Sequence, residues 1–244
     1  MMNKKLLPAA VAAALLAGVP AMQAQAEISG NIALTSDYRF RGISQSLDDI
    51  AVQGGFDYAF ENGIYVGTWG SSVDYDVSGP DGGVTGSLEL DYYIGWSSAI
   101  GDSDFGIDVG YIYYDYPGDQ GPLEGDFQEF YVGFSWKDIS VAVNYSNDYY
   151  AESGKFFYYA ADYSLGLSDT FSIDFHIGLN DLDDEDVYLS DGDSYVDYSI
   201  GLNAEWMAVT WTLAWVGTDL DGDEYFGLDD LVDDTAVFTV SKSL

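Results

Sequence analysis

The residues of this sequence with the clearest chemical potential are carboxylates set inside apolar segments at every second position. In SLELDYYIGWS (residues 87–97), Glu89 and Asp91 alternate with Leu88, Leu90 and Tyr92. Successive side chains of a β-strand point to opposite faces, so one face is apolar and the other is polar and charged. If such faces line a pore, their carboxylates favour cations and basic or zwitterionic solutes. The acids on the polar faces of predicted strands are Asp37, Asp57, Glu89, Asp91, Asp108, Glu129, Asp162, Asp174 and Asp197.

Arg39 and Arg41 are the only arginines of the sequence, and they share one face of the same predicted strand. Opposite a wall of carboxylates, they could create a transverse field that orients a solute. Alternatively, they could pair with fixed acids and act as internal struts. We favour struts, and in either case the two arginines join the acids as predicted lumen and selectivity residues.

The nearest approach to a metal-binding motif lies in the second of two strongly acidic loops, 180–193 and 217–234. Asp219, Asp221 and Asp223 alternate as in a calcium loop, and Asp230 takes the twelfth position. Gly222 stands fourth, however, whereas a calcium loop requires glycine in sixth place. We therefore expect water and loosely bound divalent cations around these loops, with no specific metal site and no cofactor.

His176 is the only histidine, and it lies two residues from Asp174 and four from Ser172 on one predicted strand face. A hydrolytic triad needs Ser, His and an acid in mutual contact, and some outer-membrane barrels hydrolyse lipids. Residues two apart on a strand form a row rather than a triad. The sequence also lacks a phosphate loop, a Cys/His metal spacing and a nucleotide fingerprint. We predict that the protein is not an enzyme.

The composition excludes several classes of partner. The formal net charge is −35, with 42 acidic residues, so no basic patch is available for nucleic acid or an anionic lipid surface. Charge alone would favour disorder, but 21 Tyr, 13 Phe and 6 Trp argue for a packed fold. The sequence has no cysteine, so disulfides do not hold it together.

The first residues predict export. Lys4 and Lys5 form a basic region, residues 6–19 form an apolar region, and Ala24-Gln25-Ala26 resembles a cleavage site for signal peptidase. This is the pattern of a secretory signal peptide over residues 1–26. A membrane anchor is the alternative, but the apolar region is short and contains Pro8. Residues 27–244 would then form one all-β domain.

Alternation predicts twelve strands in that domain. Each strand of about ten residues has the length that a tilted membrane-spanning strand requires. The predicted ranges are 28–41, 51–60, 64–75, 87–98, 104–116, 127–136, 139–145, 155–167, 171–179, 194–203, 207–216 and 235–244.

The connections between these strands alternate between short and long. Outer-membrane barrels have an even number of strands, short periplasmic turns and longer extracellular loops. A soluble sandwich, the alternative fold, gives no reason for this alternation. The pattern therefore favours a transmembrane antiparallel up-and-down β-barrel of about twelve strands with long acidic extracellular loops.

The interior of such a barrel could be open or packed. Barrels of eight strands are filled by side chains, whereas barrels of sixteen strands are water-filled, and twelve strands lie between them. We favour an open channel over a packed interior in which the acids only bond one another. Aromatic residues near strand ends are interpreted as interfacial girdles. They are Tyr92, Tyr93, Trp96, Tyr111–Tyr114, Trp136, Tyr149, Tyr150, Trp211 and Trp215.

The N-terminal third of the domain resembles the TorF family of predicted porins. The resemblance extends over essentially the whole domain, although the sequence ends on Leu244, where such barrels usually end on Phe, and Lys242 interrupts the terminal alternation. It implies an outer-membrane β-barrel with a pore function. The segments that carry it are NIALTSDYRFRGISQS (31–46), AVQGGFDY (51–58), GIYVGTWGSSV (63–73), ELDYYIG (89–95), GYIYYDYP (110–117) and EFYV (129–132).

These observations predict a passive channel for small hydrophilic solutes in the outer membrane of a Gram-negative bacterium. The expected partners are outer-membrane lipid, lipopolysaccharide, the barrel-assembly machinery during insertion, and the solutes themselves. The alternatives are a non-conducting structural or adhesion barrel and, less favoured, a lipid-modifying enzyme.

Overall fold

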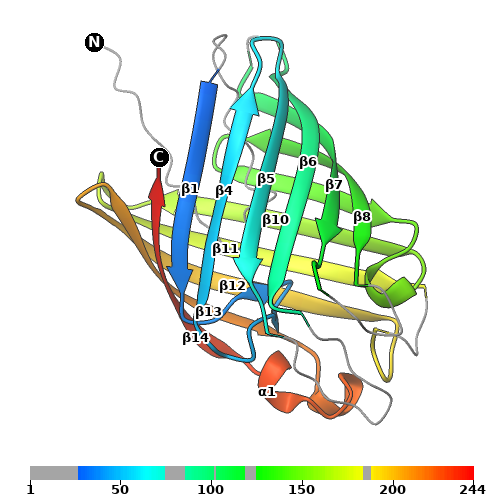
Figure 1. Cartoon of the computed structure of the whole chain (residues 1–244). Helices are drawn as coiled ribbons and strands as arrows, with labels where there is room; N and C mark the ends of the chain where they lie inside the picture. The colour runs from blue at the N-terminus through cyan, green and yellow to red at the C-terminus, as the bar shows by residue number, and fades with distance from the viewer. Residues whose placement is uncertain (1–26, 75–85, 102, 119–124, 184–187) are drawn as a thin grey trace.

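Twelve strands form a closed barrel in the computed structural model, and two short strands form a separate hairpin (Figure 1). The structure describes residues 27–74, 86–101, 103–118, 125–183 and 188–244, so the predicted signal peptide lies outside it. The hairpin consists of β2 (Arg39–Phe40) and β3 (Ile43–Ser44). The barrel strands are β1 (Glu27–Thr35), β4 (Ala51–Ala59), β5 (Ile64–Ser72), β6 (Leu88–Ala99), β7 (Phe105–Asp115), β8 (Phe127–Trp136), β9 (Ile139–Ser146), β10 (Phe156–Gly166), β11 (Phe171–Leu182), β12 (Ser194–Trp206), β13 (Val209–Thr218) and β14 (Thr235–Ser243).

Each barrel strand pairs antiparallel with the next one along the chain, and β1 pairs with β14 to close the sheet. The predicted up-and-down barrel of twelve strands is therefore confirmed. Closure leaves no free edge strand, and all ladder groups can bond within the sheet. This is the arrangement that a strand protein needs to cross a bilayer.

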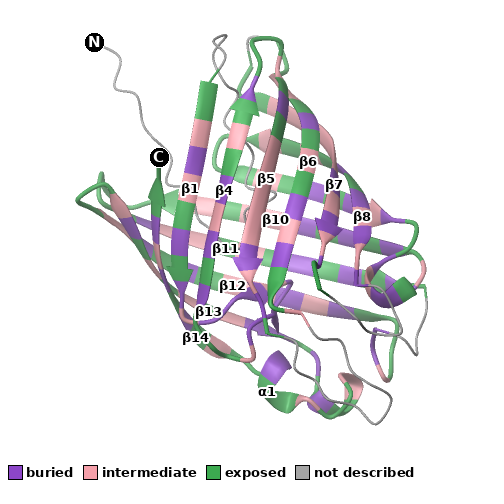
Figure 2. Cartoon of the chain, in the orientation of Figure 1, coloured by how far each residue is buried: buried purple, intermediate pink, exposed green. Residues whose placement is uncertain are grey.

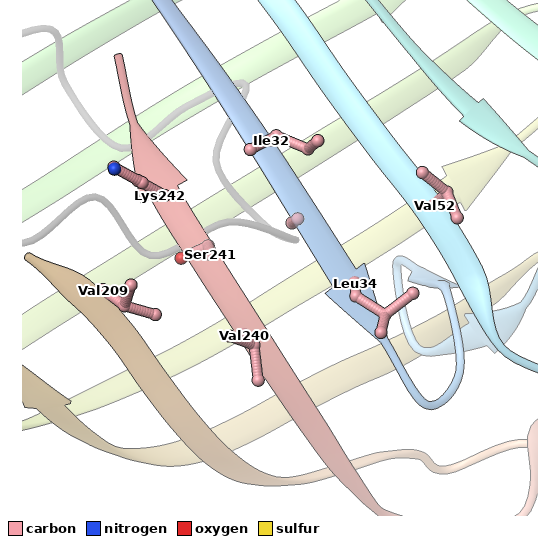
Figure 3. Close-up of a pocket in the computed structure, with 8 residues that line it drawn as sticks. Ile32, Leu34, Val52, Val209, Val240, Ser241 and Lys242 are labelled. Carbon is pink, nitrogen blue, oxygen red and sulfur yellow. The ribbon is translucent and has the colours of Figure 1, made fainter.

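The joint between β1 and β14 is the shortest pairing in the barrel. Five residue pairs join these strands, from Asn31–Ser243 to Thr35–Thr239, whereas nine join β1 to β4. A shallow groove lies across this joint on the outside of the barrel, lined mainly by apolar side chains (Figure 3). The groove belongs to the outer face and has no part in the lumen.

The outer face of the barrel is apolar over the full height of the strands. Ile94 is 51% exposed at the middle of β6, and Val132 and Phe134 of β8 are also exposed. In the same strands, Glu89, Asp91 and Glu129 point inward and are buried. An apolar exterior and a polar interior are the reverse of a soluble protein and match a membrane-spanning barrel.

A lysine placed at the middle of this outer face tests whether it contacts lipid. We expect Ile94→Lys to lower the free energy of unfolding by about 2–4 kcal/mol in lipid vesicles, because a charge at the bilayer midplane loses its hydration. Ile28→Lys, at the end of β1, is the matched control and should cost about 0–1 kcal/mol. Denaturant unfolding from vesicles measures both, and equal costs would contradict a lipid-facing exterior.

The two ends of the barrel differ. Short turns join strands at one end, here named the turn end, and long connections join them at the other, the loop end. The loop end carries η1 (Tyr150–Glu152), η2 (Gly222–Glu224) and α1 (Asp229–Val232). Within the described ranges, no helix is long and apolar enough to cross a membrane.

Candidate functional site

The acids predicted on strands face the interior of the barrel. Glu89, Asp91, Glu129 and Asp197 are almost completely buried. The others are half-buried: Asp57 of β4, Asp108 of β7, Asp162 of β10 and Asp174 of β11. The two groups lie at different heights, the buried acids toward the loop end and the half-buried acids toward the turn end.

Asp37, Arg39 and Arg41 do not lie on a barrel strand, so the strand predicted over 28–41 is wrong beyond Thr35. The chain leaves the wall there, and residues 36–50 fold into the barrel as an inserted hairpin built around β2 and β3. Thr35 and Ala51 are paired across the strands that the hairpin joins. The alternation continues through both wall and hairpin, so the pattern cannot mark the boundary between them.

The tip of the inserted hairpin is a tight turn formed by Arg41 and Gly42. Their φ angles are 49° and 82°, as in the type I′ turns that connect hairpin strands. Glycine is required at the second position by space as well as by φ, because a Cβ on Gly42 would lie 2.3 Å from Thr218 Cγ2. Arginine at the first position is unfavourable, since a residue with a Cβ loses about 1–2 kcal/mol in this conformation. The tip therefore holds Arg41 in a strained backbone conformation against the barrel wall.

Arg41 is bound by groups of the barrel wall. Its two terminal nitrogens, Nη1 and Nη2, lie 2.7 and 2.8 Å from the carboxylate oxygens of Glu129 in β8. Its guanidinium carbon lies 4.3 Å from the ring centroid of Tyr158 and 4.7 Å from that of Phe156, both in β10. Tyr149, which precedes η1, accepts a hydrogen bond from Nη1 at 3.3 Å. Here these groups and Phe40 are named the Arg41 cage.

The charge of Arg41 is maintained by this surrounding. Burial by itself would lower the pKa of the guanidinium, but the Glu129 carboxylate beside it raises that pKa above its ordinary value. Glu129 also accepts a hydrogen bond from Asn144 Nδ2 at 2.7 Å. The pair is thus a buried ion pair with one hydrogen bond, from Nη2, inside the barrel, as the strut hypothesis requires.

Arg39 connects the inserted hairpin to the loop that contains α1. It forms ion pairs with Asp37 and Asp48. It also donates to the backbone carbonyls of Leu231 and Asp233, at 2.8 and 3.2 Å. Arg39 and Leu231 are 192 residues apart in the sequence. Removal of Arg39 would therefore loosen the inserted hairpin and the loop that contains α1 together.

Aromatic side chains fill the rest of the interior at the loop end. The cluster includes Tyr114, Phe127, Tyr149, Phe156 and Tyr195, and Ile43 of the hairpin packs into it. In β6, β7 and β8 the buried residues gather toward the end where α1 lies (Figure 2). At this end the interior is packed rather than open.

This cluster corrects part of the girdle prediction. Tyr92 and Trp96 are exposed on the outer face, as expected of a girdle, but Tyr114 and Tyr149 are 1% and 2% exposed inside the barrel. Tyr93 also points inward, where its hydroxyl donates to Asp57. Neighbouring aromatics in one strand point to opposite faces, so a run of aromatic residues supplies both the girdle and the interior. That signal was present in the sequence as consecutive aromatic residues.

Toward the turn end, tyrosines of the inner face lie over glycines of neighbouring strands and bond acids. Tyr65 Oη donates to Asp108 at 2.6 Å and also contacts the hydroxyl of Tyr131. A Cβ on Gly95 would lie 2.3 Å from Tyr65 Oη. Gly95 of β6 thus leaves room for the ring of Tyr65. In this position the Tyr65 hydroxyl reaches Asp108.

Filling that space should destabilise the barrel. We expect Gly95→Ala to lower the free energy of unfolding by about 1–3 kcal/mol, because the ring of Tyr65 must leave its hydrogen-bonded position. Gly166→Ala in β10 is the control, since a Cβ there meets no described atom within 4 Å. Denaturant unfolding compares the two variants. An equal effect would mean that the ring is not fixed over the glycine.

His176 does not form a triad with Ser172 and Asp174. Its Nδ1 lies 2.7 Å from Asp162 and its Nε2 lies 2.9 Å from Asp197, so carboxylates occupy both ring nitrogens. Ser172 and Asp174 instead accept hydrogen bonds from Asn203. The imidazole is fixed between two acids and has no nitrogen left to activate a serine.

The acidic loop that half-matches a calcium motif uses its carboxylates for local contacts. Asp221 and Glu224 form a reciprocal cap on η2, and Asp219 accepts a hydrogen bond from the Val196 backbone. Asp230 lies in α1. Within the part of the chain that the structure describes, no group of three or more acidic or histidine side chains is placed to hold a metal ion.

The barrel is similar to solved porin structures. The KdgM porin superposes with a TM-score of 0.53 at 11% sequence identity, over 88% of this chain and 97% of that chain. The NanC porin gives a TM-score of 0.53 at 11% identity, over 88% and 98% of the two chains. At this identity the similarity establishes a shared fold.

A search of curated protein sequences found no match. A family model does match, and it extends over residues 21–244. The chain therefore belongs to the Gcw_chp family of bacterial proteins of unknown function.

Proposed function

We propose that this protein is an outer-membrane channel for passive diffusion of small hydrophilic solutes, with a preference for cations. The observation that supports this most is the closed barrel with an apolar outer face and an acid-bearing inner face. In this proposal the inserted hairpin closes the barrel at the loop end, and it must move before a solute can pass.

The cation preference rests on the balance of charge inside the barrel. Both arginines are engaged by carboxylates, so they add no free positive charge. Asp57, Asp108 and Asp174 remain half-buried toward the turn end, where solvent reaches them. Rings of carboxylates select for cations in other pores, and this group would act in the same way.

The other parts of the proposal follow from the sequence. We place the turn end in the periplasm and the loop end outside the cell, with residues 1–26 removed as a signal peptide. Outer-membrane lipid and lipopolysaccharide would surround the barrel, and the assembly machinery would insert it. Membership of the TorF family is likewise a proposal and is supported by the motif resemblance.

A second candidate function is a non-conducting structural or adhesion barrel. The packed loop end favours it, because the inserted hairpin and the aromatic cluster fill the interior there. A lipid-modifying enzyme has less support, since both nitrogens of His176 are held by Asp162 and Asp197.

Current recording in a planar bilayer under a salt gradient tests the channel proposal. We expect discrete steps with a cation-selective reversal potential. The double variant Asp57→Asn/Asp108→Asn should move that potential toward zero, because it removes two half-buried lumen acids while keeping the size of their side chains. A silent membrane with correctly folded protein would favour the non-conducting barrel.

A further inference from the structure

The Arg41 cage has the composition of a binding site for an organic cation. A carboxylate lies within 2.8 Å of both terminal nitrogens of the guanidinium and accepts a hydrogen bond from Nη2, and aromatic rings lie 4.3 to 5.7 Å from its central carbon. Bidentate carboxylate contacts and ring stacking are the interactions that distinguish a planar guanidinium from an ammonium. In the structure this site is filled by a residue of the same chain.

Most of the binding groups belong to the wall, and Tyr149 belongs to the loop between β9 and β10. Glu129 lies in β8, and Phe156 and Tyr158 lie in β10. Asn144 of β9, between them, pairs with Tyr158 and donates to Glu129. Of the cage residues, only Phe40 comes from the inserted hairpin. Glu129, Phe156 and Tyr158 are therefore fixed independently of the hairpin, and Arg41 binds them in the way a tethered ligand would.

Further acceptor groups lie on the inner face of β6. Asp91 is fully buried in β6, and within the described chain neither of its carboxylate oxygens has a hydrogen-bond partner. Glu89 lies two residues away on the same inner face and accepts a hydrogen bond from Tyr38 of the hairpin. Withdrawal of Arg41 would leave the buried Glu129 carboxylate without its counter-charge.

The backbone at Arg41, which attaches the guanidinium to the hairpin, is strained. Arg41 has a φ of 49°, in a turn position where Asn, Asp or Gly are favoured. A residue held in such a conformation requires compensation from its contacts, here the bonds to Glu129 and the rings. A free cation of the same chemistry makes those contacts without the backbone strain.

We propose that the Arg41 cage is a binding site for guanidinium-bearing organic cations, and that Arg41 occupies it as an internal competitor. An incoming solute of this class displaces Arg41, and the hairpin then moves away from the cage. The arrival of that solute through the lumen rests on the proposed channel function. Occupation of the cage itself does not.

Binding is tested on the refolded Arg41→Ala barrel in detergent, by thermal unfolding with ethylguanidinium and with ethylammonium at equal ionic strength. We expect ethylguanidinium to raise the unfolding midpoint saturably and to bind about tenfold tighter than ethylammonium, because only the planar guanidinium can pair with Glu129 and stack on the rings at the same time. The double variant Arg41→Ala/Glu129→Gln should bind about 10- to 100-fold more weakly, since the charged acceptor is lost. Equal responses to the two cations would overturn the proposal.

Arg41→Gly provides the same measurement if Arg41→Ala does not fold, because glycine also empties the cage and adopts the positive φ of this turn position without strain. Wild-type protein supplies an independent result in the bilayer. There, ethylguanidinium should increase the frequency of current steps more than ethylammonium does. Selective binding with a silent membrane would retain the cage and reject the channel, whereas currents without selective binding would retain the channel and reject the cage.

Discussion

Replacing Arg41 by alanine is expected to lower the free energy of unfolding by about 3–5 kcal/mol, because it leaves a buried carboxylate without its counter-charge. Glu129 is 0% exposed, so water cannot take the place of the guanidinium. The tyrosine and phenylalanine rings of the cage also lose a cation that lies within 5.7 Å of their centroids. Denaturant unfolding from vesicles measures the loss.

Two further variants identify the cause of that loss. In Arg41→Ala/Glu129→Gln the buried charge is absent, so part of the lost stability should return. Lys155→Ala removes an exposed partner of Asp183, whose side chain is 61% exposed, and should change stability by about 0–1 kcal/mol. If the double variant is no more stable than Arg41→Ala, the buried Glu129 charge is not the source of the effect.

The second large effect is expected from Arg39→Ala, at about 3 kcal/mol of unfolding free energy, because Asp37 loses its buried charge partner. The Ser44 and Ser46 hydroxyls still donate to Asp37 and limit the loss. The carbonyls of Leu231 and Asp233 lose a charged donor at the same time. Two segments distant in sequence should therefore loosen together.

Hydrogen–deuterium exchange distinguishes this coupled release from general destabilisation. Amides of the inserted hairpin and of residues 217–234 should exchange faster in Arg39→Ala, while those of β11 and β12 should not. Lys137→Ala is the matched control. Lys137 lies over the ring of Trp136, which is exposed on the outer face of the barrel. Faster exchange in the hairpin without a change in 217–234 would contradict the coupling.

The sequence predicted the barrel well because each wall strand obeys one physical rule. An inner residue such as Glu129 and an outer residue such as Val132 must alternate wherever a strand separates lipid from the lumen. Short and long connections then give the antiparallel order. Both signals are local, so they can be read without knowledge of distant contacts.

The inserted hairpin could not be predicted in the same way. Asp37, Arg39 and Arg41 continue the alternation of β1, so alternation does not mark the bend at which the chain leaves the wall after Thr35. Their positions are determined by Glu129, Leu231 and Asp233, which lie far along the chain. The inward-facing aromatic residues were assigned to the girdle for a different reason: Tyr92 and Tyr93 are adjacent and of the same residue type, but they face lipid and lumen respectively.

Single-channel recording under a salt gradient, on wild-type protein and on a variant in which residues 37–49 are replaced by a short Gly-Ser turn, tests the central claim most directly. Since Thr35 and Ala51 are already paired, a short turn can join β1 to β4. We predict larger and longer current steps in the shortened variant, with a cation-selective reversal potential in both proteins. A correctly folded but silent shortened barrel, or an anion-selective one, would contradict an acid-lined channel closed by its own hairpin.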